Sequence, residues 1–479
     1  MNTRREWLKE IADWQLEAAD EDNKRYFYQL PGVSSLQAGE RSYVLGRKGS
    51  GKTAVAEHVR GLHTHNVFIR SLSFKNFPFN ELYKLDDESY TSPSQYTTIW
   101  KYIIYVAICG MMADNSSIDP SISGELAKYF AFDVERGLAR SVSKITDIGG
   151  GFTLFGSGAN AATKKIVVEN DASWQERSDI LEELILSHVD YSKYYIIFDE
   201  LDEDYKDVFE KDMSAKYKDL LTSLFKAVQD IRRRMRKGTN IRPIIFLRSD
   251  IYELLQDNDK NKWQDSALAL AWSEGSLRDL TAFRLSRAKG IKAPILSFNT
   301  LIDELFTTDT TRAGGARRQR HVFAYILAYT LRRPRDIISY IRECARFALD
   351  NGNGKISPNN FSAVNKAYSL RMRQEFRDEM QGAIPCIDSI FDTISLIRKQ
   401  MFTFAEFEVK FNEAVAKGEI DTPLGFEAVC KVLFHYSAIG NQPSQRSAKI
   451  FQYLYPNARI NFAETAIIHP ALLQSLQIN

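Results

Sequence analysis

The sequence predicts an α/β core built on a parallel sheet, followed by a small all-helical domain and a C-terminal domain of helices and short strands. Three observations lead to this prediction. Continuous apolar runs at 194–198 and 244–247 are typical of strands that are buried on both faces of a parallel sheet. Segments with helical spacing alternate with these runs, as they do in α/β proteins. Strand signals thin out from about residue 295 onward, which marks a change of fold type.

Length and composition describe an ordinary globular chain. It has 479 residues, with 63 Lys and Arg against 61 Asp and Glu. The 29 Phe and 22 Tyr exclude a largely disordered chain, and the net charge of +2 argues against a polybasic nucleic-acid coat protein. The N-terminus lacks the apolar segment of a signal peptide, and the most apolar stretch, 102–113, is too short to cross a bilayer. We therefore expect a cytoplasmic protein that contacts no membrane.

The core elements follow from apolar spacing and from start and stop signals. A capping-box pair, Ser173 and Glu176, marks the start of one of its helices. In chain order we expect an amphipathic helix within 5–20, a strand at 41–45, a helix from about Lys52, a strand at 66–70, mostly helices over 75–140, a Gly-rich loop or loose hairpin at 145–165, a helix after Ser173, the strand 194–198, a helix over 213–237 and the strand 244–247.

The second half of the chain predicts two further domains. Pro334 begins a helix that 350–352 closes, and a second helix runs from Ser357 to about 380. Beyond it we expect a helix capped by Thr403 and Glu406, a helix that contains Phe426 and stops at Gly440, and strands at 451–455 and 460–462. Two helices and a hairpin predict a winged-helix domain. The expected domains are therefore a core at 1–295 with an N-terminal helix and an insertion at about 72–185, a helical lid at 296–385, and a winged helix at 386–479.

A glycine-rich segment after the first strand predicts a phosphate-binding loop. It matches the pattern GxxxxGK[ST] in full, within the residues Gly46, Arg47, Lys48, Gly49, Ser50, Gly51, Lys52, Thr53 and Ala54. Glycines let backbone N–H groups turn inward around phosphate oxygens, and the N-terminus of the next helix favours negative charge there. Lys52 then reaches the β- and γ-phosphates, and the Thr53 hydroxyl holds Mg²⁺. This motif predicts that ATP and Mg²⁺ are the cofactors.

Acidic residues directly after the strand 194–198 predict the second half of the same site. Asp199, Glu200 and Asp202 stand at the carboxyl end of that strand, where ligands bind in α/β sheets. We expect Asp199 to hold Mg²⁺, through water, and Glu200 to polarise the attacking water, a task that Asp202 could share. The chemistry predicted is ATP hydrolysis.

Four motifs in order resemble the AAA+/STAND class of P-loop ATPases. They are 46–54 (GRKGSGKTA), 199–202 (DELD), 246–251 (FLRSDI) and 333–336 (RPRD), and they are most similar to a bacterial ATPase family associated with defence against phage and mobile elements. The resemblance implies a P-loop NTPase core with a lid. It implies that Arg248 reads the γ-phosphate and that Arg335, at the start of the lid helix, senses the nucleotide. It leaves the arginine finger open between four residues: Arg312, Arg317, Arg318 and Arg320.

The charge distribution disfavours nucleic acid as the main partner. The basic run 232–237 ends a predicted helix, where cations are favourable in any case. Residues 386–479 contain nine acids against eight bases, whereas a DNA-reading domain is usually basic. We expect an ATPase that works as a nucleotide-dependent switch or assembly platform, as a homo-oligomer or with a protein effector. Two alternatives stay open, a DNA-binding initiator or loader and a scaffold that binds ATP without hydrolysing it.

Overall fold

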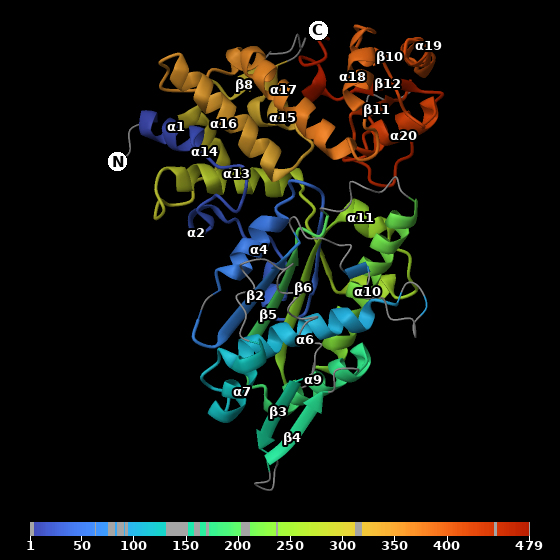
Figure 1. The fold of residues 1–479 in the computed structure, drawn as a ribbon. Helices are drawn as coiled ribbons and strands as arrows, with labels where there is room; N and C mark the ends of the chain where they lie inside the picture. The colour runs from blue at the N-terminus through green and yellow to red at the C-terminus, as the bar shows by residue number, and fades with distance from the viewer. Residues whose placement is uncertain are drawn as a thin grey trace. The chain divides into compact units, whose positions relative to one another are not determined.

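The structure is a computed structural model, shown in Figure 1. It describes residues 4–62, 64–74, 82–83, 91, 94–130, 152–157, 163–168, 172–202, 211–235, 238–311, 319–444 and 448–478. The chain forms two compact units. One, here the sheet unit, is Gln29–Ala271, and the other, here the helical unit, combines Met1–Tyr28 with Trp272–Asn479.

The sheet unit is built on a five-stranded sheet in the order β2-β5-β6-β1-β7, and all its neighbouring strands pair in parallel. The strands are β1 (Tyr43–Gly46), β2 (Val67–Ser73), β5 (Lys193–Asp199), β6 (Asn240–Arg248) and β7 (Ala267–Ala269). The predicted parallel sheet is therefore confirmed. Its register pairs Gly46 with Arg248 and Ser73 with Asp199, so the carboxyl ends of four strands meet along one edge.

Helices accompany this sheet along the chain, and a separate antiparallel hairpin interrupts them. The helices are α3 (Val33–Gln37), α4 (Lys52–Arg60), α6 (Thr97–Ala113), α7 (Pro120–Phe130), α9 (Trp174–His188), α10 (Lys211–Arg234), α11 (Ser249–Leu254) and α12 (Lys260–Asp265), and the hairpin is β3 (Phe152–Ser157) with β4 (Thr163–Val168). The hairpin begins inside the predicted Gly-rich segment 145–165, and β4 extends past the end of that segment to Val168. The predicted capping box is present at the start of α9, where the Ser173 side chain accepts from the Glu176 N–H.

Alternate residues of β5, an inner strand of the sheet, point to its two faces. Tyr194, Ile196 and Phe198 belong to one core cluster with residues of α6, α9 and α10. Tyr195 and Ile197 are equally buried but lie outside that cluster, because successive side chains of a strand point to opposite faces. Helix α4 packs against β1, β5 and β6 (Figure 1). Burial on both faces explains why β5 reads as one continuous apolar run.

The apolar stretch 102–113 lies in α6, as expected of a buried helix. Every residue of α6 from Thr98 to Met112 is buried. Trp100 contacts Phe74 and Phe198 edge to face, which joins α6 to the sheet. Within the described residues, no helix is both long and apolar enough to cross a membrane.

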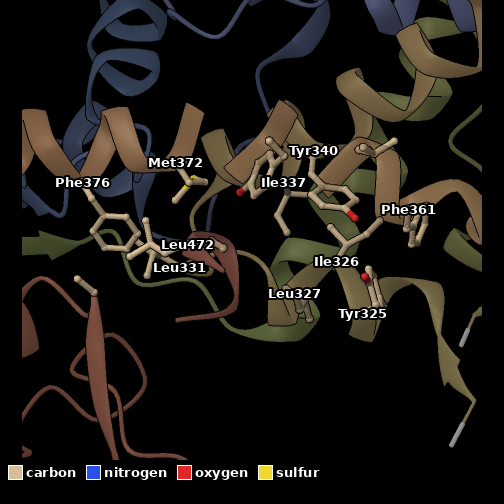
Figure 2. Packing of buried hydrophobic residues seen from close by; sticks show 14 of the residues in the cluster. Tyr325, Ile326, Leu327, Leu331, Ile337, Tyr340, Phe361, Met372, Phe376 and Leu472 are labelled. Atoms are coloured by element: carbon tan, nitrogen blue, oxygen red, sulfur yellow. The ribbon is translucent and has the colours of Figure 1, made fainter. Parts of the chain in front are cut away.

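The helical unit is dominated by helices, with a short strand pair between α14 and α15 and three further short strands near its C-terminal end. Its elements are α1 (Arg4–Ala12), α2 (Asn23–Tyr26), α13 (Glu274–Ala288), α14 (Phe298–Leu305), β8 (Thr310–Thr311), β9 (Arg320–His321), α15 (Val322–Ala328), α16 (Pro334–Asp350), η4 (Pro358–Asn360), α17 (Phe361–Met380), α18 (Ile387–Ser395), β10 (Met401–Phe402), α19 (Phe404–Ala416), α20 (Phe426–His435), β11 (Ile439–Gln442), β12 (Thr465–Ile468) and η5 (Pro470–Leu472). Figure 2 shows the core that α15, α16, α17 and η5 share, with Tyr340 beside Phe361 and Phe376 near Leu472.

The N-terminal helix belongs to the helical unit and not to the sheet unit. The indole N–H of Trp7 donates to the Leu285 carbonyl at 3.0 Å, and the Arg346 side chain donates to the Ala12 carbonyl at 3.0 Å. The unit boundaries therefore fall at 28/29 and 271/272, whereas the predicted core spans 1–295. An amphipathic pattern predicts a helix with one buried face, but only the packed structure decides which neighbour covers that face.

The C-terminal strands differ from the predicted ones. Three helices, α18, α19 and α20, accompany an antiparallel sheet in the order β10-β12-β11. The strand predictions for 451–455 and 460–462 are wrong, because these segments are turns and irregular chain. Gly440 does not end α20 but lies inside β11. A Cβ at Gly440 would lie 2.6 Å from the Ile450 carbonyl oxygen, so this glycine permits a close approach of two chain segments.

Candidate phosphate-binding site

The glycine-rich loop joins the end of β1 to the start of α4 within the sheet unit. Gly49 and Gly51 have positive φ values of 75° and 99°, a backbone region that side chains other than glycine rarely adopt. A Cβ at Gly46 would overlap the Ser50 hydroxyl. The three glycines thus let the loop curl tightly, and α4 begins directly after it at Lys52. The first N–H groups of this helix have no partner within the helix.

Lys52 folds back over this loop. Its ammonium donates to the carbonyl oxygens of Gly46 at 3.1 Å and Arg47 at 3.3 Å. Desolvation lowers the pKa of Lys52, and the nearby carboxylates of Asp202 and Asp199 oppose that shift. The cation therefore lies at the loop in a poorly solvated position, where a phosphate group is a favourable partner.

Asp199 ends β5 with its carboxylate buried. Its Oδ1 accepts the backbone N–H of Glu200 at 3.0 Å, and its Oδ2 lies 3.3 Å from the guanidinium of Arg60 on α4. Burial raises the pKa of Asp199 above its usual value of 3.8, although Arg60 opposes the shift. A buried carboxylate at the carboxyl edge of the sheet is a strong ligand for a cation that enters there.

Glu200 has an uncommon backbone conformation. Its φ is +59°, which is rare for a residue other than glycine, asparagine or aspartate. The hydroxyl of Ser73, at the end of β2, donates to its Oε2. Strain of this kind gathers at functional sites, where the surrounding structure maintains it.

Arg248 ends β6 and connects to the acidic motif. Its guanidinium makes a bidentate contact with Asp250, from Nε to Oδ1 at 3.1 Å and from Nη2 to Oδ2 at 2.5 Å. Its Nη1 lies 3.7 Å from the Asp202 carboxylate. Like Asp202, Arg248 also acts electrostatically on Lys52, so the structure brings both into the same neighbourhood as the loop.

Arg335 belongs to the helical unit, at the start of α16. There it contacts the carboxylates of Glu17 at 2.6 Å and Glu375 at 3.8 Å. Of the four arginines considered as fingers, Arg320 is exposed in the same unit, and the other three fall in 312–318, outside the described residues. The role of Arg335 as a nucleotide sensor stays a prediction.

The basic run at the end of α10 is occupied by contacts within the chain. Arg232 donates to the Glu40 carbonyl at 2.7 Å, and Arg234 lies 2.8 Å from Glu182. The last two residues of the run, 236–237, lie outside the described residues. Ordinary cation contacts account for the described part of this run.

The residues present fit a nucleoside triphosphate with Mg²⁺. The loop offers N–H donors and a lysine, and the Thr53 hydroxyl stands in the first turn of α4. Asp199 supplies a carboxylate, and oxygen atoms are the donors that Mg²⁺ prefers. Sequence reasoning missed Ser73 and Arg60. The sequence carries no local signal for either residue, because the register that pairs Ser73 with Asp199 and the position of Arg60 are set by the packing of whole elements.

Comparisons with known proteins describe what this chain is similar to. Residues 276–377 match the family model of the FunZ-associated C-terminal helical domain, and this segment lies entirely in the helical unit. A curated relative is the putative transposon gamma-delta 80.3 kDa protein of Escherichia coli, 22% identical over 471 residues. That match covers 93% of this chain but only 63% of the relative.

Solved structures show weak similarity over most of the chain. The Cdc6p structure of Pyrobaculum aerophilum is 12% identical with a TM-score of 0.34, and the match covers 94% of each chain. The Aeropyrum pernix ORC1 protein in complex with DNA is 10% identical with a TM-score of 0.39, covering 100% of this chain and 98% of that one. The Aeropyrum pernix ORC2 protein is 12% identical with a TM-score of 0.38, covering 93% and 89%.

Proposed function

We propose that this protein binds and hydrolyses Mg-ATP as a P-loop ATPase of the AAA+/STAND class. The observation that carries the proposal is the convergence of Lys52, Asp199 and Glu200 at the carboxyl edge of one parallel sheet, next to a loop in which Gly49 and Gly51 have positive φ. Each group has the chemistry that phosphoryl transfer to water requires, and the sheet supplies the edge where such ligands bind.

Each residue has a distinct task in this proposal. The loop N–H groups and Lys52 bind and orient the phosphates, and Thr53 and Asp199 hold the Mg²⁺ ion. When bound, Mg²⁺ would neutralise part of the phosphate charge. Glu200 orients a water molecule and accepts its proton. Arg248, which already contacts Asp202, responds to the γ-phosphate.

ATP turnover of the purified protein tests this proposal. We expect Lys52→Ala to lose nucleotide binding and Glu200→Gln to lose turnover while it keeps binding. The matched control is Lys128→Ala, because Lys128 is an exposed lysine of the same unit that pairs with Glu125. Turnover that survives in Lys52→Ala would contradict the proposed site. ATP binding without turnover in the unmodified protein would support the scaffold alternative instead.

We further propose that hydrolysis drives a switch that acts on a protein partner or on further copies of the chain. The near-neutral charge of residues 386–479, which we interpret as a winged-helix domain, supports a protein surface over a DNA-reading one. Light scattering with ATP, ADP and no nucleotide should show a mass that depends on the nucleotide. DNA-stimulated turnover with salt-sensitive DNA binding would favour the initiator or loader alternative.

The biological role proposed from the sequence motifs is bacterial defence through a separate effector. The curated relative's name connects that protein with a transposon, which supports a role connected with mobile genetic elements. Plaque counts in cells that express the protein test this role. We expect protection that disappears in Lys52→Ala, and equal plaque numbers with and without the intact protein would contradict it.

A further inference from the structure

Arg60, the last residue of α4, contacts the acidic motif from a neighbouring element. Its Nη2 lies 3.3 Å from Oδ2 of Asp199. Nε and Nη2 also donate to the Ser71 hydroxyl at 3.0 and 2.7 Å, and Nη1 pairs with Glu57 one turn earlier in the helix. The side chain of Arg60 is 26% exposed and that of Asp199 only 5%, so this ion pair is largely withdrawn from water.

With this contact, each oxygen of the Asp199 carboxylate has a partner. One oxygen accepts the N–H of Glu200 and the other faces Arg60. A second cation that uses Asp199 must share the carboxylate with the guanidinium or displace it. Because the pair is largely buried, solvent screens the repulsion between the two cations only weakly.

We propose that Arg60 is a positioning residue that partly neutralises Asp199 and thereby sets the affinity of the nucleotide site for Mg²⁺. This inference rests on the proposed function of the site. Helix α4 carries Lys52 and Thr53 in its first turn and Arg60 at its end. The same helix that binds the phosphates thus also holds the cation that competes for Asp199.

Arg60→Met tests this role because it removes the charge and keeps a long side chain. The measurement is the Mg²⁺ concentration that gives half-maximal binding of a fluorescent methylanthraniloyl-ATP to the full chain, which requires no turnover. We expect that concentration to fall by about tenfold in Arg60→Met, because an adjacent positive charge is removed. Arg60→Lys keeps the charge and should stay within about twofold of the unmodified protein.

The matched control is Arg70→Met. Arg70 lies on β2 of the same unit and pairs with Asp114 at 2.5 Å, away from the acidic motif. Arg70→Met should leave the Mg²⁺ concentration for half-maximal nucleotide binding unchanged. Thermal unfolding without nucleotide shows whether each variant folds. If Arg60→Met does not fold, Arg60→Gln replaces it, since its amide can still bond to Ser71 without a charge.

Two results would overturn the inference in distinguishable ways. Mg²⁺-dependent binding that is unchanged or weaker in the neutral Arg60 variants overturns the role of Arg60 and leaves the proposed function standing. No Mg²⁺-dependent binding in the unmodified protein overturns the proposed function and the inference together. Tighter Mg²⁺ binding in the neutral variants, with Arg60→Lys near the unmodified protein, supports it.

Discussion

The backbone at Glu200 allows a test that separates strain from side-chain chemistry. Glu200→Gly and Glu200→Ala both remove the carboxylate and its contact with Ser73, so in the folded protein the main difference between them is how well they tolerate the φ of +59°. In this region a residue with a Cβ costs roughly 1–2 kcal/mol. Glycine avoids this cost, but its greater freedom in the unfolded chain lowers the stability of the glycine variant by about 0.4–1 kcal/mol. The glycine variant should therefore be more stable than the alanine variant by about 1 kcal/mol.

Thermal unfolding of the nucleotide-free proteins measures this difference. A difference of about 1 kcal/mol corresponds to about 2–4 °C in the midpoint for a unit of this size. Both variants should bind methylanthraniloyl-ATP and neither should hydrolyse ATP, because both lack the residue that orients water.

The matched control is the same pair of substitutions at Glu183, an exposed residue inside α9. There the order should reverse, with alanine more stable by about 1 kcal/mol, because glycine weakens a helix interior. An alanine variant of Glu200 as stable as the glycine variant, with the reversed order present at Glu183, would refute the strain argument.

Three further predictions concern the loop, the acidic motif and the helical unit. Gly46→Ala should weaken ATP binding by at least about tenfold in a fluorescence titration, because the new Cβ would push Ser50 out of the loop; unchanged affinity would contradict the loop geometry. Asp199→Asn should stabilise the nucleotide-free protein by about 1 kcal/mol at neutral pH. Burial raises the pKa of Asp199, so its ionised form lowers the stability of the folded protein. The stability advantage of the variant should therefore grow as the pH rises above 3.8 and through the raised pKa. A difference in unfolding free energy that stays constant over several pH values would contradict this. Glu379→Gln should destabilise the helical unit by about 3 kcal/mol in urea unfolding, because it leaves the buried Arg333 with less compensation, and a loss below about 1 kcal/mol would show that the pair contributes little.

Local sequence patterns were sufficient to predict the elements whose start signals lie within a few neighbouring residues. The strand before Gly46, the helix from Lys52 and the capping boxes at Ser173 and Thr403 are present as expected. In the helix and the capping boxes the interacting groups are separated by only a few residues, so the pattern contains both partners, whereas the strand before Gly46 pairs with the distant strands β6 and β7. The strand β5 was also predictable from its continuous apolar run, because a strand that is buried on both faces needs apolar residues at successive positions.

Local patterns failed where a distant segment decides the outcome. Gly440 carries an ordinary stop signal for a helix, but it lies in a strand because the chain near Ile450 approaches it closely. The segment 451–455 has the composition of a strand, yet the sheet beside β11 is completed by β12 instead. Strand-like composition does not specify a pairing partner, so a competing strand can take the place that this segment would have had.

The sequence by itself determined the phosphate loop and the acidic motif, because each depends on contiguous residues, and it predicted the parallel sheet through the composition of its strands, although the order and register of those strands join distant segments. Only the tertiary structure decided that the helix containing Trp7 packs with residues near Leu285, and that Arg60 and Ser73 contact the acidic motif. The physical reason is that these contacts join residues 278, 139 and 127 positions apart. Such contacts depend on strand register and on the packing of whole elements, which the sequence specifies only through the complete fold.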